Sequence, residues 1–130
     1  MAGEQILVVE DNEKMRQIVV KQLESLGYHV VARASADAGL AVLAGSAPVD
    51  LLFTDIVMPG PMDGFQLARI AAASRPGVKI LMTSGFSEAR LVADDAITAE
   101  LRVLSKPYRK QELARTSREI LDAPPPSPIS

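Results

Sequence analysis

Residues 5–27, QILVVEDNEKMRQIVVKQLESLG, join a buried strand to an amphipathic helix. The first five residues, QILVV, form an almost uninterrupted apolar run rich in β-branched side chains, which is typical of a strand covered on both faces. Over residues 13–26 apolar side chains recur at helical spacing, and Gly27 is well placed to end the helix. The stretch therefore predicts one strand–helix unit of a parallel sheet.

The same alternation continues along the chain. Further strands are predicted at residues 30–32, 49–54, 79–83 and 102–104, and further helices at 36–43, 65–73 and 109–121. Adjacent aspartates and β-branched residues weaken the helical pattern over 87–96, so a fourth helix in that region stays open. Repeated strand–helix alternation favours an α/β fold in which helices cover both faces of a parallel sheet.

The C-terminal residues and the composition indicate one folded domain. Residues 122–130, DAPPPSPIS, contain four prolines and cannot continue a helix, so we expect a domain over 1–121 and a flexible tail or linker over 122–130. The 130 residues are 48% apolar, which is enough for a core. Cysteine is absent, which excludes disulfides and thiolate metal sites.

Charge and hydropathy indicate where the protein is located and which classes of partner are disfavoured. The short apolar run near the N-terminus has acidic flanks, unlike a secretory signal, and no segment is long enough to span a bilayer. A net charge of −2 argues against a general nucleic-acid binder. We therefore expect a cytoplasmic protein that contacts neither nucleic acid nor membrane directly.

Polar residues stand where the predicted strands end, which is where functional groups of an open parallel sheet collect. These residues are Glu10 and Asp11 after the first strand, Asp55 after the third, Thr83 and Ser84 at the fourth, and Lys106 after the fifth. Crowded carboxylates repel one another unless a cation compensates, and Mg²⁺ prefers such oxygen ligands. An aspartate in this setting can attack phosphorus, while a lysine and a threonine hydroxyl stabilise the phosphoryl oxygens.

Each of these residues has an ordinary explanation when it is taken alone. An acidic pair after a strand often caps a helix or lies in a solvated loop, a threonine suits any strand, and most lysines are solvated. The combination at one edge of the sheet is what favours a phosphoryl-transfer site.

Four segments resemble the signature blocks of response-regulator receiver domains of bacterial two-component signalling, namely ILVVEDNE, LLFTDIVMPGPMDGFQL, ILMTSGF and LSKPYRKQEL. They occur in the order of that family, from about residue 5 to residue 121. The resemblance implies a flavodoxin-like (βα)5 doubly wound parallel sheet of strand order 2-1-3-4-5, with a fourth helix that is short or disordered. It also implies a switch that catalyses only its own phosphorylation and dephosphorylation, and so is not an enzyme acting on other substrates.

The resemblance assigns a role to each matching residue. Asp55 would be the phosphoacceptor, with a histidine kinase or a histidine phosphotransfer domain as donor and partner. Lys106 would pair with the phosphoryl oxygens, and Thr83 would move toward them after phosphorylation. The Lys106–Pro107 peptide bond would be cis. Such a domain is expected to be a monomer or a weak dimer.

A divalent cation, Mg²⁺ or Mn²⁺, is the cofactor that the resemblance implies. Asp11 and Asp55 would bind it directly, with Glu10 close by and in contact through water. The backbone carbonyl of Val57 would be a further ligand.

Three departures from the usual family pattern bear on how this domain signals. The loop MPGPMDG is one residue longer than is common, so we expect a local bulge there. Val103 stands where many members have a Tyr or Phe that couples phosphorylation to the far surface. The stretch 84–104 resembles receivers attached to hybrid histidine kinases, which favours a stand-alone or hybrid-kinase receiver over part of a transcription factor.

The same residues bear on three other classes of protein. A phosphohydrolase with an aspartyl nucleophile usually has a second acid two positions later, where this chain has Val57. A flavin- or nucleotide-binding module is disfavoured because the loop EDNEK is acidic and lacks glycine. The alternative of a pseudo-receiver that is never phosphorylated stays open.

Met15 and Ile18 belong either to the core or to a surface that meets a kinase helix bundle.

Overall fold

The computed structural model describes residues 3–56, 62–75, 77–84, 102–106 and 108–122. Its five strands form one parallel sheet in the order β2-β1-β3-β4-β5. The strands are β1 Gln5–Val9, β2 His29–Arg33, β3 Leu51–Asp55, β4 Lys79–Ser84 and β5 Arg102–Ser105. The helices of the described part are α1 Glu13–Ser25, α2 Ala36–Ala44, α3 Gly64–Ser74 and α5 Lys110–Asp122. The predicted flavodoxin-like strand order is confirmed.

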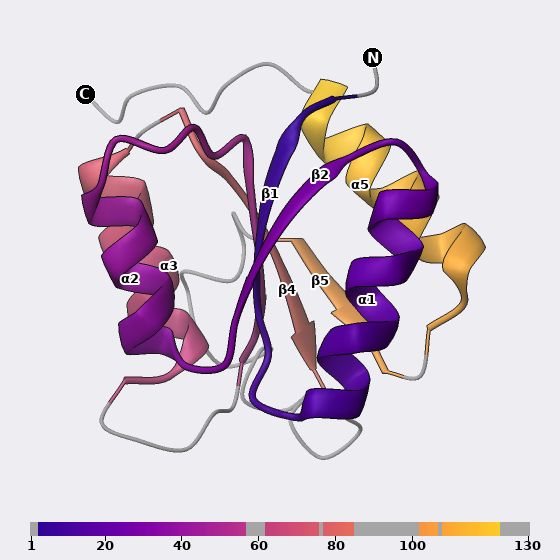
Figure 1. Cartoon of the computed structure of the whole chain (residues 1–130), viewed down its shortest axis with the longest axis horizontal. Helices are drawn as coiled ribbons and strands as arrows, with labels where there is room; N and C mark the ends of the chain where they lie inside the picture. The colour runs from indigo at the N-terminus through magenta and orange to yellow at the C-terminus, as the bar shows by residue number, and fades with distance from the viewer. Residues whose placement is uncertain (1–2, 57–61, 76, 85–101, 107, 123–130) are drawn as a thin grey trace.

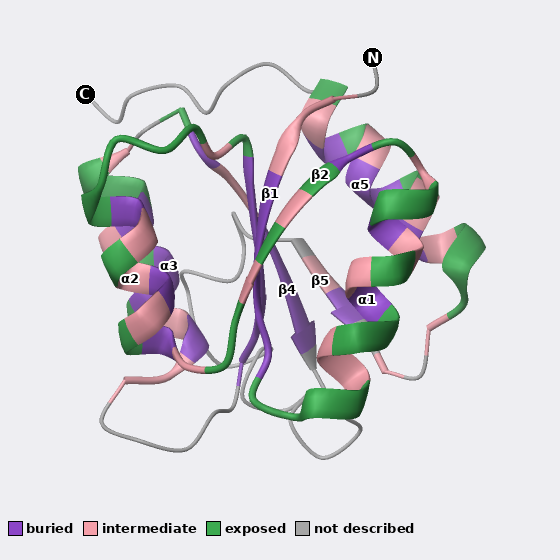
Figure 2. Cartoon of the chain, in the orientation of Figure 1, coloured by how far each residue is buried: buried purple, intermediate pink, exposed green. Residues whose placement is uncertain are grey.

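The sheet lies between two layers of helices. Helices α1 and α5 cover one face, and α2 and α3 cover the other (Figure 1). Successive side chains of β1 point to opposite faces, so Ile6 and Val8 join the core beneath α1 and α5. Leu7 and Val9 join the core beneath α2 and α3. Burial is therefore concentrated along the central strands, and the outer faces of the helices are exposed (Figure 2).

Local signals in the sequence set the ends of the helices. The side chains of Asn12 and Ser35 accept hydrogen bonds from the first turns of α1 and α2. Asp63 and Gln66 form a reciprocal capping box at the start of α3. Gly27 follows α1 with φ at 99°, in the left-handed region, and so ends that helix as predicted.

Most boundaries lie within a residue or two of the predicted ones, and β3 differs in a way that matters. The strand begins at Leu51 and not at residue 49, because Asp50 binds the start of β1. The Asp50 carboxylate accepts a hydrogen bond from Gln5 N at 2.7 Å. The N–H of Asp50 donates to Gln5 O at 2.8 Å. Asp55, predicted to follow the strand, is its last residue. The backbone of Asp55 is therefore held by the sheet itself.

Several predictions fall outside the described residues. These are the extra residue in the loop 58–64, the fourth helix, the cis form of the Lys106–Pro107 bond and the tail, apart from Asp122, which ends α5. Among the helices that the structure describes, none is long and apolar enough to cross a membrane.

Candidate functional site

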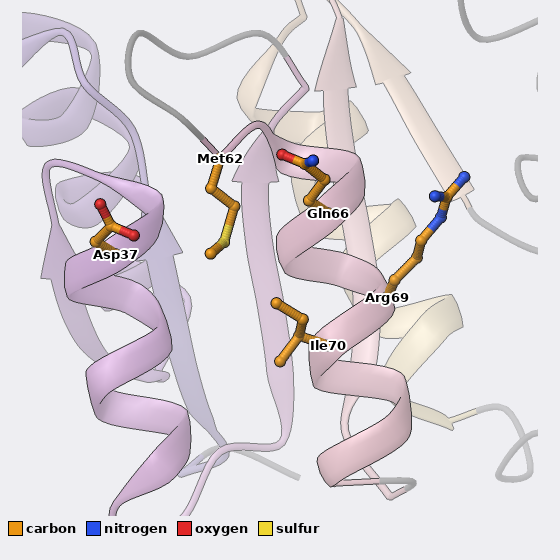
Figure 3. Close-up of a pocket in the computed structure, with 5 residues that line it drawn as sticks. All are labelled: Asp37, Met62, Gln66, Arg69 and Ile70. Atoms are coloured by element: carbon orange, nitrogen blue, oxygen red, sulfur yellow. The ribbon is translucent and has the colours of Figure 1, made fainter.

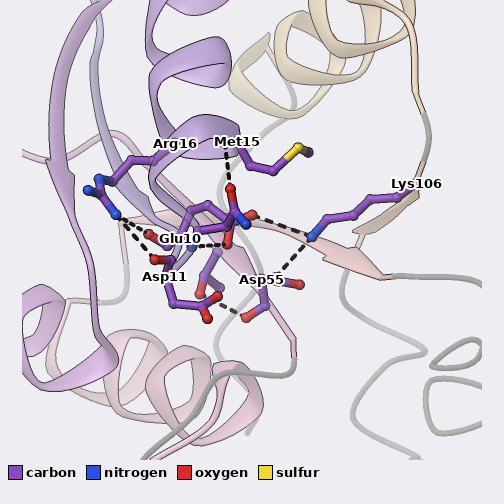
Figure 4. Close-up of polar contacts among 8 residues, drawn as sticks. Glu10, Asp11, Met15, Arg16, Asp55 and Lys106 are labelled. Atoms are coloured by element: carbon purple, nitrogen blue, oxygen red, sulfur yellow. Dashed lines mark hydrogen bonds and ion pairs between the residues drawn. The ribbon is translucent and has the colours of Figure 1, made fainter.

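The acidic residues predicted to converge do so at the carboxyl edge of the sheet. Glu10 and Asp11 follow β1, and Asp55 ends the neighbouring strand β3. One carboxylate oxygen of each residue lies within 4.8 Å of the other two. Glu10 and Asp55 are buried, while Asp11 is exposed. Figure 4 shows the three side chains grouped around one point in front of the sheet.

Lys106 directly follows the edge strand β5, and its side chain extends to this group of acids. Its Nζ lies 2.9 Å from Oδ2 of Asp55 and 3.4 Å from Oε1 of Glu10 (Figure 4). The carboxylates of Asp55 and Glu10 are 9% and 6% exposed, and the lysine side chain is 24% exposed. The predicted acids and lysine thus share one small, largely buried volume.

Thr83 occupies the position on β4 that is paired in register with Asp55 on β3. Its side chain is buried, and its carbonyl accepts from the N–H of Ile56 at 3.0 Å. The threonine hydroxyl predicted for the site therefore belongs to the strand that neighbours Asp55. Val57, predicted to contribute a carbonyl ligand, lies outside the described residues.

The electrostatics of the site reflect crowded carboxylates around one ammonium. Burial raises the pKa of Glu10, and the charge of Asp55 adds to that effect, while the Asn12 N–H and Lys106 oppose it. Burial alone would lower the pKa of Lys106, but its hydrogen bond to Asp55 and the charges of both acids outweigh burial, so this pKa is raised. Lys106 is therefore charged at neutral pH, and the site favours added positive charge.

Two residues that the sequence did not single out hold the acidic loop. The N–H of Asn12 donates to Oε2 of Glu10 at 3.2 Å. A guanidinium nitrogen of Arg16 donates to the carbonyl oxygen of Glu10 at 2.9 Å and to that of Asp11 at 3.5 Å. Asn12 has a readable signal, since it precedes a helical pattern, whereas nothing in the pattern predicted that Arg16 would turn back toward the loop.

Tyr108 is a further neighbour that sequence reasoning missed. Its ring packs edge-on against Phe53 of β3, with 6.4 Å between ring centroids. Burial raises the pKa of its hydroxyl, and the negative charges of Glu10 and Asp55 raise it further. The aromatic ring also packs against the core beneath α1 and α5.

Glycine at position 64 permits the close approach of α3 to the end of β3. A Cβ at this position would lie 2.0 Å from the carbonyl oxygen of Asp55. The Gly64 N–H instead donates to Ile56 O at 2.8 Å. The start of α3 is therefore packed directly against the backbone of the acidic site.

The donor set fits a hard divalent cation. Three carboxylates provide oxygen ligands, and a partly exposed arrangement leaves room for water and phosphate oxygens. With no histidine or cysteine in the group, a soft or borderline metal such as zinc is disfavoured. These residues could therefore hold Mg²⁺ or Mn²⁺.

A second hollow lies between α2 and α3, away from the acidic group. Figure 3 shows Asp37 on α2 opposite Gln66 and Ile70 on α3, with Met62 above them. Arg69 completes the lining. None of the predicted site residues contributes to this hollow, so it is no part of the acidic site.

Comparisons with known proteins identify the family of this chain. The family model described as "Response regulator receiver domain" matches residues 6–118. The response regulator receiver protein CpdR of Brucella abortus is 39% identical over 118 residues, which cover 91% of this chain and 97% of CpdR. The sensor kinase CckA of the same species is 33% identical over 118 residues, covering 90% of this chain but only 12% of CckA.

A solved structure leads to the same family. The response regulator receiver protein of Sinorhizobium medicae superposes with a TM-score of 0.84 at 26% identity, covering 93% of this chain and 96% of that protein. Its similarity in fold and the matching family model agree with the strand order described above. The chain belongs to the response regulator receiver domain family of two-component signalling.

Proposed function

We propose that the chain is a phosphorelay receiver in which Asp55 accepts a phosphoryl group from a phosphohistidine donor. An oxygen of the Asp55 carboxylate forms a bond to phosphorus as the P–N bond of the phosphohistidine breaks, and the imidazole nitrogen leaves with the electron pair. Attack by water on the aspartyl phosphate releases phosphate and restores the carboxylate. The observation that carries this proposal is the contact between Asp55 and Lys106 inside a group of carboxylates.

Asp55 is the best nucleophile among the three acids. It ends the central strand β3, where it is paired in register with Thr83 of β4. Its carboxylate contacts Nζ of Lys106 at 2.9 Å, which would give the transferred oxygens a cationic partner. Asp11 is exposed, and the pKa of Glu10 is raised by burial, so both acids are less suited to attack.

Mg²⁺ or Mn²⁺ is the proposed cofactor. Asp11 and Asp55 would bind it directly, Glu10 would bind directly or through water, and the carbonyl of Val57 would complete the protein ligands. When bound, the cation neutralises charge on the phosphoryl oxygens and on the carboxylates.

Lys106 and Thr83 are proposed to act together on the phosphoryl group. Lys106 would transfer its contact from the carboxylate to a phosphoryl oxygen, and Thr83 would donate a hydrogen bond from β4. Val103, half-buried against Ile56 and Met82, takes the place of the usual aromatic partner. The conformational change after phosphorylation would then pass through β4 and β5 without the rotation of an aromatic side chain.

The proposed partner is a histidine kinase or a histidine phosphotransfer domain. Ile18 on α1 is 51% exposed and lies on the helix that follows the acidic loop. An aliphatic side chain that is exposed on this helix would be available to a helical partner. We further propose that the protein is a monomer or a weak dimer in a bacterial cytoplasm and does not contact nucleic acid directly. The proposed receiver domain covers residues 1–121, and a flexible tail follows it.

The experiment that tests the proposal is intact mass spectrometry with a small phosphodonor and Mg²⁺. We expect the wild type to gain one phosphoryl group and to bind beryllofluoride, whereas Asp55→Asn should do neither. Omission of the metal should suppress both reactions. Phosphorylation that persists in Asp55→Asn would overturn the assignment, and a wild type that never reacts would identify a pseudo-receiver scaffold.

A further inference from the structure

Arg16 contacts the acidic pair through the main chain and not through its carboxylates. Its guanidinium donates to the carbonyl oxygens of Glu10 and Asp11, at 2.9 and 3.5 Å (Figure 4). Arg16 belongs to the first turn of α1, where its own N–H bonds the carbonyl of Asn12 at 2.9 Å. The side chain therefore reaches back across the loop that leads into its helix.

This contact constrains the direction of two peptide units. When a carbonyl is fixed by a donor, the adjoining backbone torsions are restricted, and the side chains on either side are directed accordingly. Glu10 is held on its carboxylate by the Asn12 N–H and by Lys106, at 3.2 and 3.4 Å. Asp11 is exposed and lies in a loop, so its carboxylate depends on the backbone for its direction.

We propose that Arg16 is a positioning residue that holds the loop of Glu10 and Asp11 in the conformation that binds a divalent cation. The inference rests on the proposed function, because it assumes that these acids bind the cation. It assigns the effect of Arg16 to hydrogen bonds with carbonyls and not to its charge.

The two effects have opposite signs, which makes the inference testable. A guanidinium near a cation site repels the cation, so removal of its charge alone would tighten binding. Loss of the hydrogen bonds would loosen the loop and weaken binding, as occurs when partners that orient metal ligands are removed. A weaker affinity after the loss of a positive charge therefore identifies positioning.

The experiment is a calorimetric titration of Mn²⁺ alone into the wild type, Arg16→Ala, Arg16→Gln and Lys14→Ala. We expect Arg16→Ala to bind Mn²⁺ about tenfold more weakly. Arg16→Gln, which keeps one donor without the charge, should fall between the wild type and the alanine variant. Lys14 is an exposed residue of the same helix, and Lys14→Ala removes the same charge without touching the loop, so its affinity should be unchanged or slightly tighter.

The outcomes separate the two proposals. Equal or tighter Mn²⁺ binding by Arg16→Ala or by Arg16→Gln, beside a wild type that binds, overturns the positioning role and leaves the proposed function standing. A wild type that does not bind Mn²⁺ overturns both. Circular dichroism of each variant establishes that it is folded, and Arg16→Gln alone decides the matter if Arg16→Ala does not fold.

Discussion

Nζ of Lys106 lies 2.9 Å from Oδ2 of Asp55, although 51 residues separate the two in the sequence. The same ammonium also faces Glu10, so one cation offsets the repulsion within a group of carboxylates. This relationship makes the lysine a stabilising residue, in addition to the role proposed for it.

We expect Lys106→Met to lower the free energy of unfolding by about 2 kcal/mol at pH 7 in EDTA. The loss should be smaller than for a fully buried pair, because 24% of the lysine side chain is exposed. Urea denaturation measures it, with Lys21→Met on the exposed face of α1 as the control. An unchanged midpoint for Lys106→Met would show that the carboxylates do not need this partner.

Glu10→Gln should stabilise the metal-free protein at neutral pH by roughly 0.5–1 kcal/mol. Burial raises the pKa of Glu10, so proton binding favours the folded state. That contribution is complete below the ordinary value of 4.5 and is lost as the pH rises through the raised pKa. Glutamine keeps the hydrogen-bond acceptor and cannot ionise. The advantage should therefore disappear below about pH 4.5 in urea titrations, and a constant difference across pH would contradict this explanation.

The ion pair between Glu4 and Arg118 should show the opposite dependence on pH. A hydrogen bond from Arg118 lowers the pKa of Glu4, so the stabilisation is present above the ordinary value of 4.5 and is lost as the pH falls through the lowered pKa. Glu4→Gln should cost about 0.5–1 kcal/mol at pH 7 and little in strong acid. Glu24→Gln, on the exposed face of α1, is the matched control. The prediction fails if both variants lose the same stability at pH 7.

Gly64→Ala should disturb the acceptor strand directly. The added methyl would lie 2.0 Å from the carbonyl oxygen of Asp55, so either α3 or the end of β3 must move. We expect a loss of about 2–3 kcal/mol in unfolding free energy. In Gly77→Ala the new methyl would meet nothing within 4 Å, so this variant should be close to neutral in thermal denaturation. Similar melting temperatures for the two variants would refute the packing argument.

Much of the site follows from the sequence because parallel strands place their carboxyl ends at one edge. That rule brings Glu10, Asp11 and Asp55 together without knowledge of any contact, and the strand order adds Lys106. The start of β3 was predicted two residues early, because an apolar run cannot show that Asp50 would bind the main chain of Gln5.

The supporting contacts were harder to predict than the acids themselves. Arg16 lies within a helical pattern, and such a pattern predicts only which face of the helix is apolar. It does not predict that the guanidinium of Arg16 bends back to the carbonyl of Glu10. The contact of Tyr108 with Phe53 depends on how β5 leads into α5, which is a tertiary feature. Long polar and aromatic side chains therefore account for most of what the sequence pattern missed.

The bond between Lys106 and Glu10 spans 96 residues, and it joins the first strand of the sheet to the segment after the last one. A partly folded intermediate that lacks either β1 or the segment after β5 cannot contain the complete group of site residues. Under the proposed function, a newly synthesised chain therefore gains its acceptor chemistry only when the last strand has docked. Competence to receive a signal and completion of the fold are then one and the same event.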